Sequence, residues 1–273
     1  FHQFCSGDTI EWFEKHGVAL KIEDDGRMFP VSNSSQTIID CFLKATQKLK
    51  IDVLTGQSVQ ELYRGENYWK ISTHQEVFSC QKVVMATGSN SKMWELMQNL
   101  GHSIIEPVPS LFTFNIKDVR IKDLMGLSTF ASVKVKKSKL QASGPLLITH
   151  WGMSGPGILR LSAWGARELA DKKYQFAIQV NWLNETDFED VIDLLKNIKE
   201  ENSKKLVSKY AHFDLPKRLW ENLVKASEIT EETKWADVNK KQLNTLAEQL
   251  TNAEFQVNGK STFKEEFVTA GGI

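Results

Sequence analysis

The pattern of apolar residues changes twice in the second half of the chain, and this feature constrains the fold most. Residues 110–135 alternate apolar and polar positions, as around Phe112, which is typical of strands with one buried face. Further strand patterns lie at 146–149 and 176–180, with a helix predicted between them up to about Ala170. Residues 184–252 instead show the spacing of amphipathic helices. Strand patterns return at 253–257 and 263–268. A helical segment enclosed by strands predicts a β domain with a helical insertion.

The first part of the chain mixes helix and strand signals. Helices are predicted at 8–16 and 32–50, because capping residues precede apolar positions at helical spacing. Short strand patterns lie at residues 18–22, 51–54, 59–63, 68–73 and 77–79. Residues 82–86 form a continuous, mostly apolar run, which favours a strand buried on both faces of a parallel sheet.

The end of the strand predicted at 82–86 is the first candidate ligand site. The strand stops abruptly at Thr87 and Gly88. In open α/β sheets, ligands bind beyond the carboxyl ends of the strands, and glycine lets a ligand approach the backbone closely. A plain strand-to-helix turn explains the same residues, and both interpretations stay open.

The C-terminal segment is the second candidate ligand site. Thr269, Ala270, Gly271 and Gly272 follow a strand pattern. Two adjacent glycines leave backbone amides uncovered, so that a flat or anionic group can lie against them. The alternative is a loose chain end.

The segment 149–156 is the third candidate, and it contains His150 within the string Thr-His-Trp-Gly-Met-Ser-Gly-Pro. Ser-Gly-Pro before a helix is typical of a capped start whose N–H groups can bind an anion. His150 is the one candidate for a catalytic acid or base, because imidazole transfers protons near neutral pH. The alternative, a histidine that ties a tight turn together, is the commoner situation.

Composition argues against several classes of function. Lys plus Arg and Asp plus Glu both total 34, and this balance disfavours a broad contact with nucleic acid or a membrane surface. No apolar run approaches the roughly 20 residues of a membrane-spanning helix. Cys5, Cys41 and Cys80 and the histidines lack metal-ligand spacing, so no metal site is predicted. The thiols are expected to be buried and reduced, which fits the cytoplasm.

Several motifs, taken in order, resemble those of the aminoacetone-oxidase-like flavoproteins. This is a family of bacterial FAD-binding enzymes often described only as NAD(P)/FAD-dependent oxidoreductases. The motifs are G-R-M-F-P-V-S at 26–32, V-V-M-A-T-G at 83–88, L-G-H at 100–102, L-L-I-T-H-W-G-M-S-G-P-G-I-L at 146–159 and V-T-A-G-G-I at 268–273. The T-H-x-G-x-S-G-P string and the T-A-G-G segment are the most specific of them.

The resemblance implies a fold of the class α/β plus α+β. A partial, Rossmann-like FAD-binding domain is interrupted by a β-barrel-like domain, which itself holds a helical subdomain. The expected boundaries are 1–106, 107–183, 184–252 and 253–273. Family members begin with a G-x-G-x-x-G unit and finish with a G-E segment near the flavin, and neither occurs at the ends of this chain. The chain is therefore expected to be an internal fragment, inactive by itself.

The resemblance also implies which residues contact the cofactor. These residues are Val59, Ala86, Thr87, Gly88, Thr269, Ala270, Gly271 and Gly272. Val59 is expected at the adenine, residues 86–88 beside the dinucleotide, and residues 269–272 at the isoalloxazine ring. Ser89 departs from the family, which commonly has a second glycine and a longer loop there, so no role of that loop is transferred.

These observations predict that the parent protein is an FAD-dependent oxidoreductase acting on a small molecule, with NAD(P) as a possible second cofactor. The fragment itself is expected to bind FAD weakly or not at all, and no nucleic-acid or membrane partner is expected. The alternative is a non-catalytic insert region that binds a partner or substrate through its helical arm. A relative of the tRNA-modifying flavoproteins is a third interpretation, which the neutral charge disfavours. No pattern specifies the oligomeric state.

Overall fold

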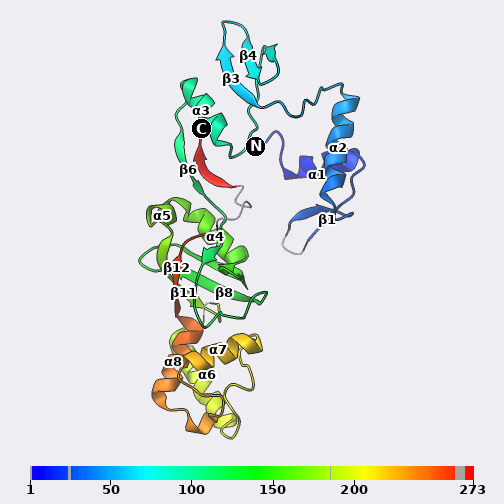
Figure 1. Cartoon of the computed structure of the whole chain (residues 1–273). Coiled ribbons are helices and arrows are strands. Elements are labelled where there is room, and N and C mark those ends of the chain that lie inside the picture. Colours follow the sequence, from blue (N-terminus) through cyan, green and yellow to red (C-terminus); the bar gives the residue numbers. More distant parts are fainter. Residues whose placement is uncertain (1, 24–25, 185, 262–267) are drawn as a thin grey trace. The chain divides into compact units, whose positions relative to one another are not determined.

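The computed structural model describes residues 2–23, 26–184, 186–261 and 268–273. The chain divides into two compact units, 1–83 and 84–273, and each is described by itself. Figure 1 shows their helices and strands, coloured along the sequence. The domain boundaries expected from the sequence remain predictions.

The described part of the first unit contains helices and small antiparallel sheets. Its elements are α1 (Ser6–Lys15), β1 (Leu20–Ile22), β2 (Met28–Pro30), α2 (Ser35–Lys48), β3 (Val59–Arg64), β4 (Trp69–Thr73) and β5 (Val77–Cys80). Cys5 and Asp8 cap the start of α1 reciprocally, and Ser34 caps α2 by accepting a hydrogen bond from the Gln36 N–H. The predictions of both helices are confirmed to within a few residues.

Two strand predictions are wrong. Residues 51–54 and 82–86 have no strand conformation, and Val84 is 88% exposed. A strand forms only where neighbouring strands take up its N–H and C=O groups, and no described residue pairs with 82–86. The apolar character of these two segments was therefore not sufficient to predict a strand. The Rossmann-like part of the expected fold is not seen in the described residues.

A nearly closed antiparallel barrel forms the centre of the second unit. Its strands are β7 (Phe114–Asn115), β8 (Ser128–Val135), β9 (Gln141–Ile148), β10 (Gly152–Ser154), β11 (Gln175–Asn181) and β12 (Ala253–Asn258). They lie in the order β12-β11-β8-β9-β10-β7. Inward positions are buried and outward positions exposed, as the alternating pattern predicted. The predicted barrel-like domain is confirmed.

Backbone contacts bring the two edges of this sheet together. The Asn115 N–H donates to the Gly259 carbonyl at 2.9 Å, and the Ser261 N–H donates to the Thr113 carbonyl at 3.1 Å. The Asn115 side chain donates to the Lys260 carbonyl at 2.7 Å. These bonds occupy edge groups that would otherwise be open to pairing with another chain.

Two short helices, α4 (Pro156–Trp164) and α5 (Ala166–Asp171), follow β10. Ile158 and Leu161 of α4 are fully buried and pack on the barrel interior. A Cβ on Gly144 of β9 would lie only 3.3 Å from the Gly157 nitrogen, so the start of α4 approaches the strand backbone closely.

The helical insertion follows β11, as predicted. It contains α6 (Phe188–Glu201), α7 (Lys217–Ala226), a 3₁₀ turn η1 (Trp235–Asp237) and α8 (Lys240–Thr251). Trp220 and Trp235 are almost fully buried, and the Trp220 indole N–H donates to the Val207 carbonyl at 2.9 Å. The apolar core of the helices is continuous with that of the barrel.

A two-stranded ribbon completes the second unit. β6 (Ile105–Pro109) follows α3 (Ser91–Asn99) and pairs antiparallel with β13 (Thr269–Gly272). The register shifts between Ala270 and Gly272, so the ribbon has an irregularity there. Of the strand predicted at 263–268, residues 263–267 lie outside the described residues.

Candidate functional site

A small cavity in the second unit brings together the two segments predicted to lie at the flavin. Its volume is about 220 Å³. It is lined by residues 85–89, by Met93, Trp94 and Met97 of α3, and by Thr269, Gly271, Gly272 and Ile273. The Ser89 and Thr269 hydroxyl oxygens are 3.2 Å apart and share a hydrogen bond. Two segments that are distant in sequence therefore meet at this cavity, which we call the ribbon cavity.

Arg167 of α5 holds the ribbon that forms one wall of the ribbon cavity. One guanidinium nitrogen donates to the Ala270 carbonyl at 2.9 Å, and the other donates to the Glu106 carbonyl. The two acceptors belong to opposite strands, β13 and β6. Arg167 thus fixes the backbone at the point where the register shifts.

The glycines of this segment are required by backbone geometry. Gly271 has φ +116°, and a Cβ there would lie 2.5 Å from an Arg167 nitrogen and 2.8 Å from the Glu106 carbonyl oxygen. Gly272 has φ +109° and faces Trp94, whose indole nitrogen would be 3.5 Å from an added Cβ. Both φ values lie where residues other than glycine are strained.

The ribbon cavity fits part of a dinucleotide cofactor. Sites for drug-sized ligands usually have volumes of about 300–1,000 Å³, so about 220 Å³ accommodates one portion of FAD and not the whole. Bare glycine backbone and the Ser89 and Thr269 hydroxyls can contact an edge of a flat ring or a polar group. The other contacts of a complete FAD have to come from residues outside this cavity.

The predicted site residues are distributed as follows. Ala86, Thr87, Gly88, Thr269, Gly271 and Gly272 all line the ribbon cavity. Ala270 lies in the same ribbon, with its carbonyl bound by Arg167. Val59 begins β3 in the first unit, and His150 lines a different cavity. Contact of any of them with a flavin stays a prediction.

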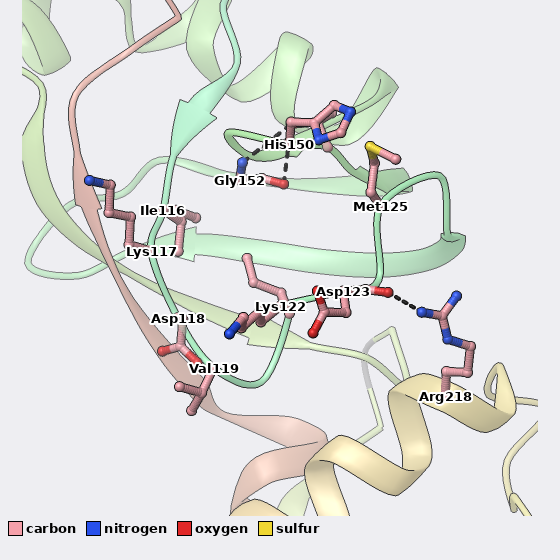
Figure 2. A pocket seen from close by; sticks show the side chains of 12 residues that line it. Ile116, Lys117, Asp118, Val119, Lys122, Asp123, Met125, His150, Gly152 and Arg218 are labelled. Carbon is pink, nitrogen blue, oxygen red and sulfur yellow. Dashed lines mark hydrogen bonds between the residues drawn. The ribbon is translucent and has the colours of Figure 1, made fainter.

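The cavity beside His150 is larger, about 770 Å³, and is shown in Figure 2. It is lined by residues 116–119, 121–123 and 125 between β7 and β8, by Thr149, His150 and Gly152, and by Arg218 of α7. We call it the loop cavity. Its residues come from the barrel and from the helical insertion.

Thr149, not His150, ties the turn of the T-H-W-G-M-S-G-P segment. Its hydroxyl accepts hydrogen bonds from the Trp151 and Gly152 N–H groups, at 3.3 and 3.2 Å, and His150 is exposed. A Cβ on Gly152 would lie 2.2 Å from the Phe114 carbonyl oxygen. The glycine is thus explained by the close approach of β10 to β7, without a ligand. The structure shows no proton-transfer partner for His150 among the described residues.

Asp118 and Arg120 form a half-buried ion pair at the loop cavity. The guanidinium donates twice to the carboxylate, at 2.9 and 2.7 Å, and stacks on the Phe255 ring with 4.0 Å to its centre. Burial would raise the pKa of Asp118, but the hydrogen bonds and charge of Arg120 outweigh it and hold the pKa below its usual value. The pair is neutral overall and stabilises the loop.

Other sequence predictions are settled only in part. Cys41 is buried as expected, whereas Cys5 is exposed because its thiol faces Asp8 at the open end of α1. Within the described ranges, no group of three or more His, Cys, Asp or Glu side chains is arranged to hold a metal. None of the described helices combines the length and apolar character needed to cross a membrane.

The fold places the chain among proteins with a six-stranded antiparallel barrel and a helical insertion after the fifth strand. The family described as "HI0933-like protein barrel and H2TH domain" matches residues 108–268, which is more than half of the chain. The chain belongs to this HI0933-like family. It is a family of FAD-dependent, oxidoreductase-type proteins.

Named relatives cover nearly all of the chain. It is 26% identical to the ribosomal RNA dihydrouridine synthase of Escherichia coli, over 99% of this chain and 67% of the relative. The corresponding values are 23%, 99% and 68% for the Haemophilus influenzae protein of the same name, and 21%, 99% and 68% for the 3-dehydro-bile acid delta(4,6)-reductase of Clostridium scindens. The chain spans about two thirds of the length of each relative.

The comparisons support the predicted resemblance at the level of the oxidoreductase family. They do not extend it to the aminoacetone oxidases, since these three relatives have other names. The short motifs shared with the aminoacetone-oxidase-like proteins include glycines that the barrel and ribbon need for backbone geometry. Such glycines specify a fold and leave the substrate open.

Proposed function

We propose that the full-length protein is an FAD-dependent oxidoreductase whose cofactor lies partly against the ribbon cavity. The observation that supports this most is the meeting of residues 86–89 with residues 269–272 around one space. The glycine backbone and the two hydroxyls that line this space suit a flat polar ring system. Membership of the HI0933-like family supports the same proposal.

The reaction we propose is the reduction of a carbon–carbon double bond conjugated with a carbonyl group. The names of the relatives describe such reductions, of uridine in one case and of a 3-keto bile acid in the other. Bound FAD, once reduced by NAD(P)H, would supply a hydride to one carbon of the double bond, and a proton would be added to the other carbon. In this scheme the protein binds and orients the ring systems and excludes water, and Arg167 keeps the β6–β13 ribbon in place.

Two substrate classes are compatible with this chemistry. The chain-wide charge balance favours a small molecule without a nucleic-acid partner, and the Clostridium relative has such a substrate by name. The Escherichia coli and Haemophilus influenzae relatives suggest a uracil base in RNA. The non-catalytic alternative, an insertion that only binds a partner, requires that no flavin chemistry occurs at all.

Purification of the full-length protein tests this proposal. We expect a yellow protein with the visible spectrum of a bound flavin, which NAD(P)H bleaches in the absence of oxygen. Addition of a conjugated enone or of uridine-containing RNA then restores the colour if it is a substrate. A full-length protein that is colourless and takes up no added FAD would refute the proposal.

A further inference from the structure

The loop cavity differs in charge from the chain as a whole. Its lining contains three exposed cations, Lys117, Lys122 and Arg218, and the carboxylates of Asp118 and Asp123. Arg120 neutralises Asp118 through two direct hydrogen bonds. Three cations therefore face one uncompensated carboxylate, although the net charge of the whole sequence is zero.

The three cations are available for a ligand. Within the described ranges, neither Lys117 nor Lys122 forms an ion pair. The Arg218 guanidinium donates to the backbone carbonyl of Asp123, which leaves its positive charge without a carboxylate partner. An exposed lysine loses little free energy when it has no ion-pair partner, so the missing partners alone do not indicate a ligand. The positions of the three cations relative to one another indicate which ligand they suit.

The cations lie apart from one another along the cavity. Figure 2 shows Lys117 at the left, Lys122 near the centre beside Asp123, and Arg218 of α7 at the right. A single small anion is held best by donors that converge on one point. Separated cations instead suit a chain of charges, and a nucleic-acid strand carries one every few ångströms.

Exposed apolar side chains accompany these charges. Val119 is 81% exposed and Met125 50% exposed, both in the wall of the loop cavity. Trp151, next to the turn, is 52% exposed, and His150 is exposed as well. Flat side chains near a cationic groove provide surfaces on which unpaired bases can stack.

The wall of the cavity is held in place before any ligand binds. Ile116, Ile121 and Leu124 anchor the loop in the core, where each is at most 6% exposed. From α7, Asn222 donates to the Arg120 carbonyl at 3.0 Å, and Arg218 binds the loop directly. A preformed groove loses less conformational entropy on binding than a flexible loop.

From this geometry we infer that the loop cavity binds the sugar–phosphate backbone of single-stranded RNA, with Lys117, Lys122 and Arg218 contacting successive phosphates. The inference rests on the proposed function, since it identifies RNA as the substrate class of the flavin site. It departs from the expectation that no nucleic acid is bound. That expectation was based on the net charge of the whole chain, and a net charge of zero does not exclude a local group of cations.

The test is the salt dependence of RNA binding by the full-length protein, measured by fluorescence anisotropy with a labelled oligouridylate. The variant is the triple change Lys117→Ala, Lys122→Ala and Arg218→Ala. Loss of three phosphate contacts is expected to lower the slope of log affinity against log salt by about 2, at about 0.7 per phosphate, and to weaken binding roughly tenfold or more at low salt.

Matched variants keep this test decisive. The triple change Lys139→Ala, Lys204→Ala and Lys209→Ala removes the same charge from exposed positions outside the loop cavity and is expected to change the slope much less. Because Arg218 also contacts the loop, the double change Lys117→Glu and Lys122→Glu serves as a second variant that leaves α7 in place. It is expected to weaken binding more than neutralisation of the same two lysines.

The outcomes separate this inference from the proposed function. A yellow protein that binds RNA equally well in both triple variants, or binds none, overturns the RNA inference and leaves the flavin proposal standing. Competition by free uridine monophosphate as strong as that by the oligomer also overturns it, because one phosphate would then suffice. A colourless protein contradicts the flavin proposal whatever it binds.

Discussion

At the scale of single residues, the ribbon cavity depends on Gly271. Gly271 has φ +116°, and a Cβ added there would lie 2.5 Å from an Arg167 nitrogen. Alanine at this position would therefore strain the backbone and displace the Arg167 side chain. We expect Gly271→Ala to lower the free energy of unfolding by about 2 kcal/mol or more and to weaken FAD binding. Denaturant unfolding and a flavin titration of the full-length protein measure the two effects.

Gly126→Ala is the matched control for this change. Gly126 also has positive φ, +83°, but nothing lies within 4 Å of an added Cβ. Gly126→Ala should lower the free energy of unfolding by about 1 kcal/mol, from backbone strain alone, and should leave the affinity for FAD unchanged. Equal effects of both changes on FAD binding would show that the crowding at Gly271 is irrelevant to the cofactor.

Arg167 is expected to act as a positioning residue. Arg167→Ala removes the hydrogen bonds to the Ala270 and Glu106 carbonyls, so the ribbon loosens where the flavin is proposed to lie. We expect FAD affinity to fall by about tenfold, equivalent to about 1.4 kcal/mol. The unfolding midpoint should fall only slightly, since Arg167 is exposed.

Arg160→Ala is the corresponding control, because Arg160 is an exposed arginine of α4 that contacts the Trp164 ring. It should leave FAD affinity as in the wild type. If Arg167→Ala and Arg160→Ala both retain wild-type affinity for FAD, the Arg167 hydrogen bonds to the ribbon have no part in cofactor binding.

At the scale of elements, the helical insertion contains a titratable group with a shifted pKa. His212 packs against Trp220 and Trp235, with ring centres 5.4 and 5.6 Å apart. Burial, followed by the nearby charge of Lys205, lowers the pKa of His212 below its usual 6.5. The folded state therefore disfavours the protonated ring.

The sign of the resulting pH effect follows from linkage. The unfolded chain binds the proton more readily, so the contribution of His212 to stability is fully present above about pH 6.5 and falls as the pH drops toward its folded-state pKa. His212→Gln should make the free energy of unfolding less dependent on pH below about pH 6.5. Lys205→Ala should reduce this dependence only slightly, since burial is the larger cause. A His212→Gln variant with an unchanged pH dependence would contradict this account.

Elements with a clear periodicity were predictable from the sequence. The alternation along β8 and β11 and the helical spacing of 184–252 predicted the barrel and its insertion, because those patterns reflect burial on one face. The strand predicted at 82–86 failed, since an apolar run does not specify which strands pair with it. The turn predicted around Gly152 contains the short strand β10, whose pairing with β7 joins residues far apart in sequence.

At the scale of the whole molecule, the sequence motifs mark both cavities but miss the cations of the loop cavity. The segments around Thr87 and Thr269 were singled out individually, and the structure shows that they line the same space. The loop cavity contains Thr149, His150 and Gly152 of the third motif, but no motif included its cations, because Lys117, Lys122 and Arg218 come from separate segments that the fold brings together. A local charge count over 117–122 gives a net positive value and is the sequence signal that could have indicated these cations.

The account as a whole depends on whether the ribbon cavity holds part of the flavin. Ser89→Trp places a large side chain in that cavity, whereas Ser128→Trp places the same side chain on an exposed strand position outside it. The most direct measurement is the FAD content of the full-length protein, determined from its visible spectrum, in the wild type and both variants. We expect wild-type FAD content for Ser128→Trp and a folded but colourless Ser89→Trp protein. Equal FAD content in all three would contradict the central claim.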